Sequence, residues 1–215
     1  MRHDQDHFGW KSFKALSPKK KLQHILYYYK WHFLAAVLVL CLLFSLISDV
    51  RENAKDVLIS GIFVNTAVDQ SGYDYLQQGY WESCGSDSGS RADLVTYRHI
   101  DTGTGALDQE DAASFMVITS MIAAGTLDYI ITDEATLEYF LQQEVVLDLK
   151  DVFSEEALSK YDVIEADGTA AAIRLNNSDF AQKYPLTEED SCLLLAVSTQ
   201  DYEKDIRFIQ YVMGY

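Results

Sequence analysis

The sequence predicts an α/β protein: a single, mostly parallel sheet flanked by helices and preceded by one transmembrane helix. Two observations carry this prediction. An apolar run without a charged residue, Phe33 to Ile47, separates a short basic segment from a long acidic remainder. In that remainder, short segments rich in β-branched residues alternate with amphipathic segments of helical period, as in a mostly parallel sheet covered on both sides.

The apolar run predicts a membrane-spanning helix that begins before Phe33. Residues Phe33 to Ile47 rise by about 22 Å in a helix, less than the roughly 30 Å of a hydrocarbon core. Three tyrosines and a tryptophan in Tyr27–Trp31 suit the headgroup layer, where a ring stays apolar while its polar tip is wet. We therefore expect residues 25–48 to span the membrane in contact with lipid.

Charge predicts the direction of this helix. Seven basic residues precede the apolar run, against two acidic ones: Arg2, Lys11, Lys14, Lys19, Lys20, Lys21 and Lys30, with Asp4 and Asp6. Basic residues stay on the cytoplasmic side, so we expect residues 1–24 inside the cell and residues 49–215 outside, in a single-pass protein of the cell membrane. A cleaved signal peptide is the alternative, but no small-x-small pair follows Leu46. Cys41 follows a leucine, whereas a small residue normally precedes a lipidated cysteine.

The outer region is strongly acidic. Of the 17 basic and 33 acidic residues in the chain, 7 and 2 precede the anchor, which leaves a net charge of about −21 for the rest. Such a charge favours solubility and repels nucleic acid and anionic lipid, so we expect no nucleic-acid partner. The acidic residues are scattered, which is typical of a solvated surface and also compatible with cationic ligands or basic partners.

The first half of the outer region predicts three strands, each followed by a helix. The expected strands are Asp56–Asn65, Leu94–Ile100 and Leu127–Ile131. The first is nearly unbroken in apolar residues, which indicates burial on both faces, whereas Leu94–Ile100 alternates and should lie nearer an edge. Helical spacing follows in three groups: Tyr73, Leu76 and Tyr80; Phe115, Ile118, Met121 and Ile122; Leu137, Phe140 and Leu141.

Local signals mark the ends of these helices. Ser71-Gly72 opens the first, Asp108 caps the second and Gly125 ends it, and Thr132-Asp133 caps the third. The second half predicts an extended Val145–Leu149, a small helix near Ser154–Tyr161, a strand Thr169–Leu175, a buried strand Cys192–Val197 and a last helix capped by Ser198-Thr199. The expected order is therefore strand and helix in alternation, then two strands and a helix.

Residues Ala123–Leu149, AAGTLDYIITDEATLEYFLQQEVVLDL, resemble a segment of extracytoplasmic solute-binding proteins of the type 2 periplasmic-binding fold. In that family a helix ends in A-G-x-x-D, a strand delivers a Thr-Asp or similar pair, and the next helix ends in G-x-L-x-x-L. The matching positions are Gly125, Asp128, Asp133, Leu147 and Leu149, while Glu144 stands where glycine is usual. The closing block Leu193–Met213 is similar to the family's return strand into its first lobe.

The resemblance implies one lobe of such a protein, with ligand contacts in the loops at the carboxyl ends of the strands. Carried over, the candidate ligand-binding residues are Asn65, Thr66, Asp101, Thr102, Thr132, Asp133 and Thr199. Helix capping explains Thr132, Asp133 and Thr199 equally well, so both interpretations stay open. Residues Asp151–Ser191 are too few for a second lobe, so we expect no hinged cleft within the chain.

The sequence offers little that points to catalysis. Asp101-Thr102-Gly103 occurs once, whereas aspartic proteases need two such carboxylates, and His99 is the one histidine after the anchor. Cys84 and Cys192 form no C-x-x-C pair; a disulfide between them and two free thiols are both possible by count. We expect no catalytic residues, no metal site and no cofactor.

These observations predict a non-catalytic extracytoplasmic domain for binding or interaction, such as an accessory to a membrane transporter or envelope complex. The alternative is a membrane-tethered receptor for a small solute, completed by a partner or a dimer, because one lobe alone cannot close around a ligand. An enzyme is not expected.

Overall fold

The computed structural model describes residues 34–35, 37–41, 56–85, 89–101 and 108–215. The chain divides into two compact units, Met1–Ala54 and Lys55–Tyr215. In the first unit, residues 34–35 and 37–41 are helical and the large apolar side chains among them are exposed. The segment 1–24 and most of the expected span 25–48 lie outside the described residues. Within the described ranges, no helix combines the length and apolar character that crossing a membrane requires.

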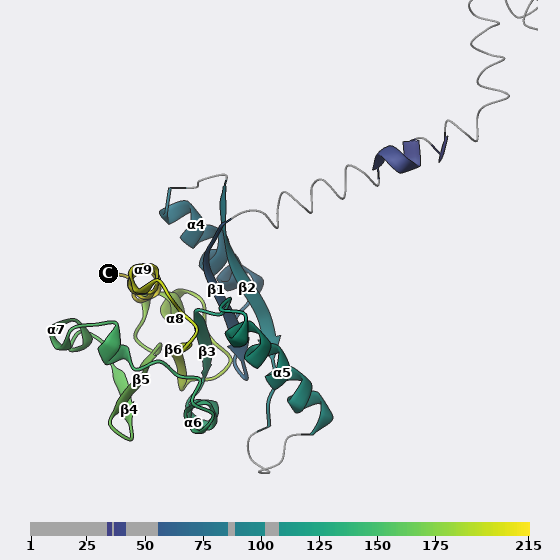
Figure 1. The fold of residues 1–215 in the computed structure, drawn as a ribbon. Coiled ribbons are helices and arrows are strands. Elements are labelled where there is room, and N and C mark those ends of the chain that lie inside the picture. Colours follow the sequence, from purple (N-terminus) through teal and green to yellow (C-terminus); the bar gives the residue numbers. More distant parts are fainter. Residues whose placement is uncertain (1–33, 36, 42–55, 86–88, 102–107) are drawn as a thin grey trace, which may run out of the picture. The chain divides into compact units, whose positions relative to one another are not determined.

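The second unit is built on a six-stranded sheet with the order β2-β1-β3-β6-β5-β4 (Figure 1). The strands are β1 (Asp56–Val64), β2 (Ser90–Arg98), β3 (Tyr129–Asp133), β4 (Val163–Ala166), β5 (Thr169–Arg174) and β6 (Ser191–Leu195). β1 pairs in parallel with β2 and β3, whereas the β3–β6, β6–β5 and β5–β4 pairs are antiparallel. Four of the six strands share one direction, so the mostly parallel α/β sheet is confirmed, with an antiparallel half that the sequence did not predict.

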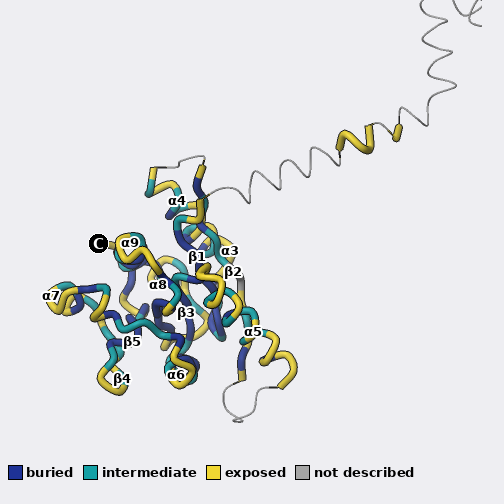
Figure 2. Tube along the Cα trace, viewed as in Figure 1, coloured by how far each residue is buried: buried dark blue, intermediate teal, exposed yellow. Residues whose placement is uncertain are grey.

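Helices cover both faces of the sheet. They are α3 (Gln70–Asp74), the π-helix η1 (Tyr75–Gly79), α4 (Tyr80–Ser83), α5 (Gln109–Ala123), α6 (Glu134–Gln142), the 3-10 helix η2 (Leu149–Asp151), α7 (Glu155–Leu158), α8 (Asp179–Lys183) and α9 (Tyr202–Met213). η1, α4, α8 and α9 pack on one face through Leu76, Tyr80, Phe180 and Phe208. α5 and α6 pack on the other face. Figure 2 shows the buried residues gathered along the strands between these layers.

The two faces of the sheet explain why β1 has no polar alternation. Ile59 and Phe63 point into the core under α9, whereas Ile62 and Val64 point into the core under α5 and α6. Both sets are almost fully buried, so successive residues of the strand all need apolar side chains. The expected edge position of the second strand is also confirmed, because β2 ends the sheet.

Several predicted helix ends are confirmed. Asp108 caps α5 by accepting hydrogen bonds from the amides of Glu110 and Asp111, and Asp133 caps α6 by accepting one from the amide of Thr136. Gly125 has a φ of 66°, the left-handed conformation that favours glycine after a helix.

Two predicted helix starts are wrong. Asp69, not Ser71, caps the first helix, and Asp201, not Ser198-Thr199, caps the last one. The second difference has a tertiary cause: the hydroxyl of Ser198 donates to the carbonyl of Leu127, and that of Thr199 lies against two carboxylates.

The antiparallel half begins with a hairpin that the sequence analysis missed. β4 and β5 are joined by Asp167 and Gly168, with φ values of 52° and 85°. Asp-Gly with two positive φ angles is typical of a two-residue hairpin turn. Val145–Leu149, expected to be extended, makes one isolated bridge, Val146 to Ala196.

β1 reaches beyond β3 at its amino end. β3 pairs with β1 only over Gly61–Phe63, whereas β2 pairs with β1 from Asp56 onward. Among the described residues, Asp56–Ser60 therefore have a strand neighbour on one side only. The pairing with β2 is irregular between Val57 and Ile59.

Candidate functional site

The structure places most of the predicted ligand-binding residues at the carboxyl edge of the parallel strands, where several of them bond to neighbouring side chains or to the backbone. Asn65, at a φ of 56°, accepts a hydrogen bond from the amide of Ile100 (2.8 Å) and donates to its carbonyl (2.8 Å) and to Oγ1 of Thr136 (2.6 Å). Thr66 is buried and its hydroxyl pairs with that of Ser191 at 2.8 Å. These side chains tie β1 to β6, α6 and the end of β2.

The remaining candidates at this edge have separate surroundings. Asp101 is exposed and its amide donates to the carboxylate of Asp111, whereas Asp133 caps α6. Thr132 is fully buried, and its hydroxyl has no hydrogen-bond partner among the described residues. Thr102 lies outside the described residues. Whether any of these residues contacts a ligand stays a prediction.

Thr199 does not belong with the others. It follows β6, which runs antiparallel to β3, so it lies at the opposite edge of the sheet. Thr199 therefore does not lie beside Asn65, although both were candidates on the basis of the resemblance; whether Thr199 contacts a ligand stays a prediction.

Replacing Asn65 by Ala should destabilise the unit Lys55–Tyr215 by about 2–3 kcal/mol, because three hydrogen bonds are lost and alanine disfavours a positive φ. Urea unfolding of a fragment covering residues 55–215 measures this change. Asn177→Ala, in an exposed turn, is the matched control and should stay within about 0.5 kcal/mol of the wild type. Equal unfolding midpoints for the two variants would contradict the structural role of Asn65.

The opposite, amino edge of β1 and β3 holds a cleft of about 520 Å³. We call it the Asp128 cleft. Its charged and polar lining comes from five segments that are far apart in the sequence: Ser60, Gln77, Arg91, Asp93, Thr126, Asp128, Gln200, Asp201, Lys204 and Asp205. Val57, Leu94 and Met121 add apolar surface.

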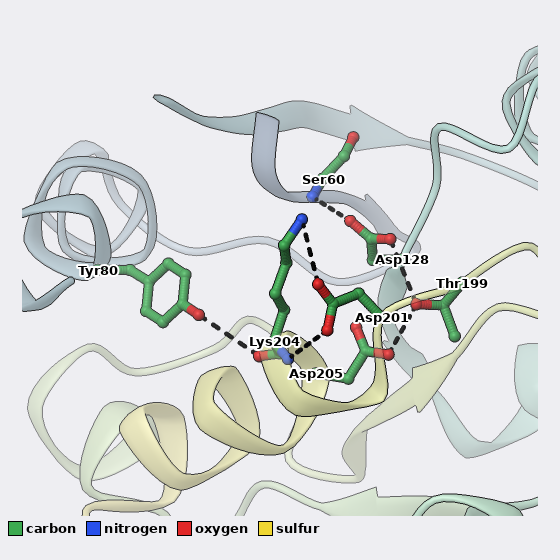
Figure 3. Close-up of polar contacts among 7 residues, drawn as sticks. All are labelled: Ser60, Tyr80, Asp128, Thr199, Asp201, Lys204 and Asp205. Carbon is green, nitrogen blue, oxygen red and sulfur yellow. Dashed lines mark hydrogen bonds and ion pairs between the residues drawn. The ribbon is translucent and has the colours of Figure 1, made fainter. Parts of the chain in front are cut away.

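Asp128 takes the place of a strand partner for β1. Its carboxylate Oδ2 accepts a hydrogen bond from the amide of Ser60 at 2.7 Å (Figure 3). Its own amide donates to the carbonyl of Ser60 at 2.9 Å. Its carbonyl accepts from the amide of Ala196 at 2.8 Å. Asp128 thus joins β1 and the segment after β6 at the point where β3 begins.

Thr199 lies between two carboxylates, as Figure 3 shows. Its Oγ1 is 2.7 Å from Oδ2 of Asp205 and 3.3 Å from Oδ1 of Asp128. A hydroxyl carries one proton and can donate to only one of them. Burial raises the pKa of Asp205 to about 7 and also raises the pKa of Asp128. When Asp205 is protonated, it can donate to the hydroxyl of Thr199, which leaves the proton of that hydroxyl for Asp128.

The cations that line the cleft already have acidic partners. Arg91 Nε lies 2.9 Å from Asp93 Oδ1, and Lys204 Nζ lies 3.5 Å from Asp201 Oδ2. In the described part of the chain, no Lys or Arg nitrogen lies within 4 Å of a carboxylate oxygen of Asp128 or Asp205. The inner end of the cleft is therefore acidic and its rim is ion-paired.

Sequence reasoning missed Asp205, although a signal was present. Asp205, Phe208, Ile209 and Val212 recur at helical spacing and form the buried face of α9. An acid on an otherwise apolar helix face indicates a buried carboxyl group with a polar partner elsewhere in the fold.

Within the described ranges, no group of three or more His, Cys, Asp or Glu residues is placed to hold a metal ion.

Comparison with known proteins gives no match to this chain among family models, curated proteins or solved structures. The resemblance to one lobe of a solute-binding protein therefore stays a prediction. The function has to be inferred from the geometry of the Asp128 cleft and from the sequence before the domain.

Proposed function

We propose that this chain is a single-pass membrane protein that presents a non-catalytic binding domain outside the cell membrane. The proposal rests on the apolar run after a basic segment and on the acidic unit Lys55–Tyr215 that follows. Residues 34–35 and 37–41, within the run, are helical with exposed apolar side chains, which suits contact with lipid.

The Asp128 cleft carries the binding part of the proposal. Its volume of about 520 Å³ falls within the usual range of small-ligand sites, about 300–1,000 Å³. Asp128 and Asp205 offer acceptors at its inner end, and Gln77 and Gln200 offer exposed amides at its rim. The carboxyl edge is less suitable, because the side chain of Asn65 is already hydrogen-bonded to the backbone of Ile100 and that of Thr66 to Ser191.

Two kinds of binding domain fit this geometry. An interaction domain, for example an accessory to a transporter or envelope complex, would receive part of a protein partner in the cleft. A receptor for a small solute is the alternative, and it needs a partner or a second copy to cover the ligand, since a single lobe forms the whole cleft.

A ligand of the cleft should raise the melting temperature of the full chain in detergent micelles. The compounds to test are sugars, oligosaccharides, amino acids, peptides and divalent cations. A ligand present at a hundred times its Kd adds about 2.7 kcal/mol to the free energy of unfolding. Thr126→Trp should abolish a saturable shift by filling the cleft. Met116→Trp, on the exposed face of α5, should preserve it. A shift that survives Thr126→Trp would contradict binding in the cleft.

Cys84 should react with a membrane-impermeant maleimide on intact cells. It is a free thiol, partly exposed at the end of α4, whereas Cys192 is buried and burial raises the pKa of its thiol. Cys84→Ser should remove the labelling and Cys192→Ser should leave it unchanged. Labelling that requires permeabilised cells would contradict the proposed orientation.

A further inference from the structure

The Asp128 cleft lies along an open strand edge. Asp56–Ile59 of β1 pair with β2 on one side and, among the described residues, have no strand on the other. Ser60 and Asp128 close the last position of this edge through two hydrogen bonds. The cleft begins directly beyond that closure, where Val57 and Ser60 line it and Val57 is 37% exposed.

The lining comes from both sides of the sheet at this edge. Met121 and Thr126 belong to α5 and the residues after it, which cover one face. Gln77 and Lys204 belong to η1 and α9, which cover the other face. The cleft therefore surrounds the position that a strand in line with β3 would occupy. At about 3.3 Å per residue, Asp56–Ile59 offer about 13 Å of edge.

The charges that line the Asp128 cleft favour a ligand with a basic side chain. Arg91 and Lys204 are held by Asp93 and Asp201, while Asp128 and Asp205 have no ion-pair partner among the described residues. The unit as a whole is strongly acidic. A basic side chain is thus attracted over a distance and finds its counter-charge at the inner end.

We propose that the Asp128 cleft binds an extended polypeptide segment, which adds as a strand beside Asp56–Ile59 of β1 and directs a Lys or Arg side chain toward Asp128. Backbone hydrogen bonds to the open edge supply affinity, and the acidic inner end supplies the preference for a basic residue. This inference rests on the proposed function, because it assigns a class of partner to the same cleft.

Selection from a displayed library of random 12-residue peptides on the full chain in nanodiscs tests the inference. Selected peptides should carry a Lys or Arg among β-branched residues. Calorimetry with their synthetic forms should show at least a tenfold loss of affinity when alternate backbone amides on one edge of the peptide are methylated. Replacing the basic residue by norleucine should cost at least tenfold as well, with the protein left unchanged.

Variants of the chain complete the test. Thr126→Trp and Asp128→Asn should each weaken the selected peptides at least tenfold, whereas Met116→Trp should bind as the wild type does. Peptides whose affinity is unchanged by backbone methylation or by Thr126→Trp would overturn the inference. A library that yields no peptide with different affinities for the wild type and Thr126→Trp would overturn it too. If the peptide tests fail but the thermal screen finds a small ligand whose effect Thr126→Trp abolishes, only the inference of strand addition fails. If the thermal screen finds no such ligand either, the proposal that the Asp128 cleft is a binding site fails as well.

Discussion

Replacing Asp205 by Asn is expected to stabilise the unit Lys55–Tyr215 at and above neutral pH and to leave it nearly unchanged at pH 4. The carboxyl of Asp205 is almost completely buried, and its nearest polar partner is the hydroxyl of Thr199. Burial raises its pKa from 3.8 to about 7. The ionised form therefore costs free energy in the folded state that asparagine, which is neutral at every pH, does not.

The sign follows from proton counting. Between about pH 4 and pH 7, the folded wild type holds a proton on Asp205 that the unfolded chain has released. The contribution of Asp205 to the free energy of unfolding therefore falls as the pH rises through this window and levels off above it. The advantage of Asp205→Asn grows over the same window, to an upper limit on the order of 4 kcal/mol. Burial also raises the pKa of Asp128. Asp128 therefore also lowers the free energy of unfolding as the pH rises.

Urea unfolding of residues 55–215 at several pH values measures both curves. Asp201→Asn is the matched control: Asp201 is about half exposed, and asparagine can still cap α9. That variant should follow the wild-type curve within about 0.5 kcal/mol. A constant difference between Asp205→Asn and the wild type from pH 4 to pH 8 would contradict a buried, protonated Asp205.

Replacing Gly61 by Ala should cost about 3 kcal/mol, at the upper end for overpacking in a core. Gly61 lies in β1 opposite Tyr129 of β3, and a Cβ at this position would overlap the Tyr129 ring. That ring cannot move aside, because it is almost fully buried and its centroid lies 4.2 Å from that of Phe208. The glycine is needed for the close approach of the ring.

A double-mutant cycle separates this clash from a general effect of alanine. Tyr129→Val retains a strand-forming side chain but removes the ring, so Gly61→Ala should be nearly neutral in that background. The coupling energy, obtained from urea unfolding, should equal most of the cost of Gly61→Ala alone. Additive effects of the two substitutions would show that the ring is not the cause.

The strands buried on both faces could be predicted from sequence, because their side chains record the burial directly. β1, β3 and β6 are rich in apolar residues, and each strand was expected within a few residues of its observed bounds. Asp108 and Asp133 were also recognisable, since capping depends on residues only two or three positions away.

Strand direction and the cleft could not be predicted in the same way. The direction of the strand now called β6 was not predicted, and its antiparallel pairing with β3 places Thr199 at the other edge of the sheet. There Thr199 meets Asp128 and Asp205, the first of which is 71 positions away. No local pattern encodes such a meeting, although Asp167-Gly168 did carry the signal for the β4–β5 hairpin.

The position of α9 has a consequence for biogenesis. This last helix covers β1, the first strand, and its Phe208 packs against Tyr80 and Tyr129. A chain that leaves the ribosome N-terminus first therefore keeps that apolar face uncovered until Tyr202–Met213 have emerged. In the proposed topology, β1 reaches the outside of the membrane before α9 does, so the apolar face of the sheet is exposed there until α9 arrives.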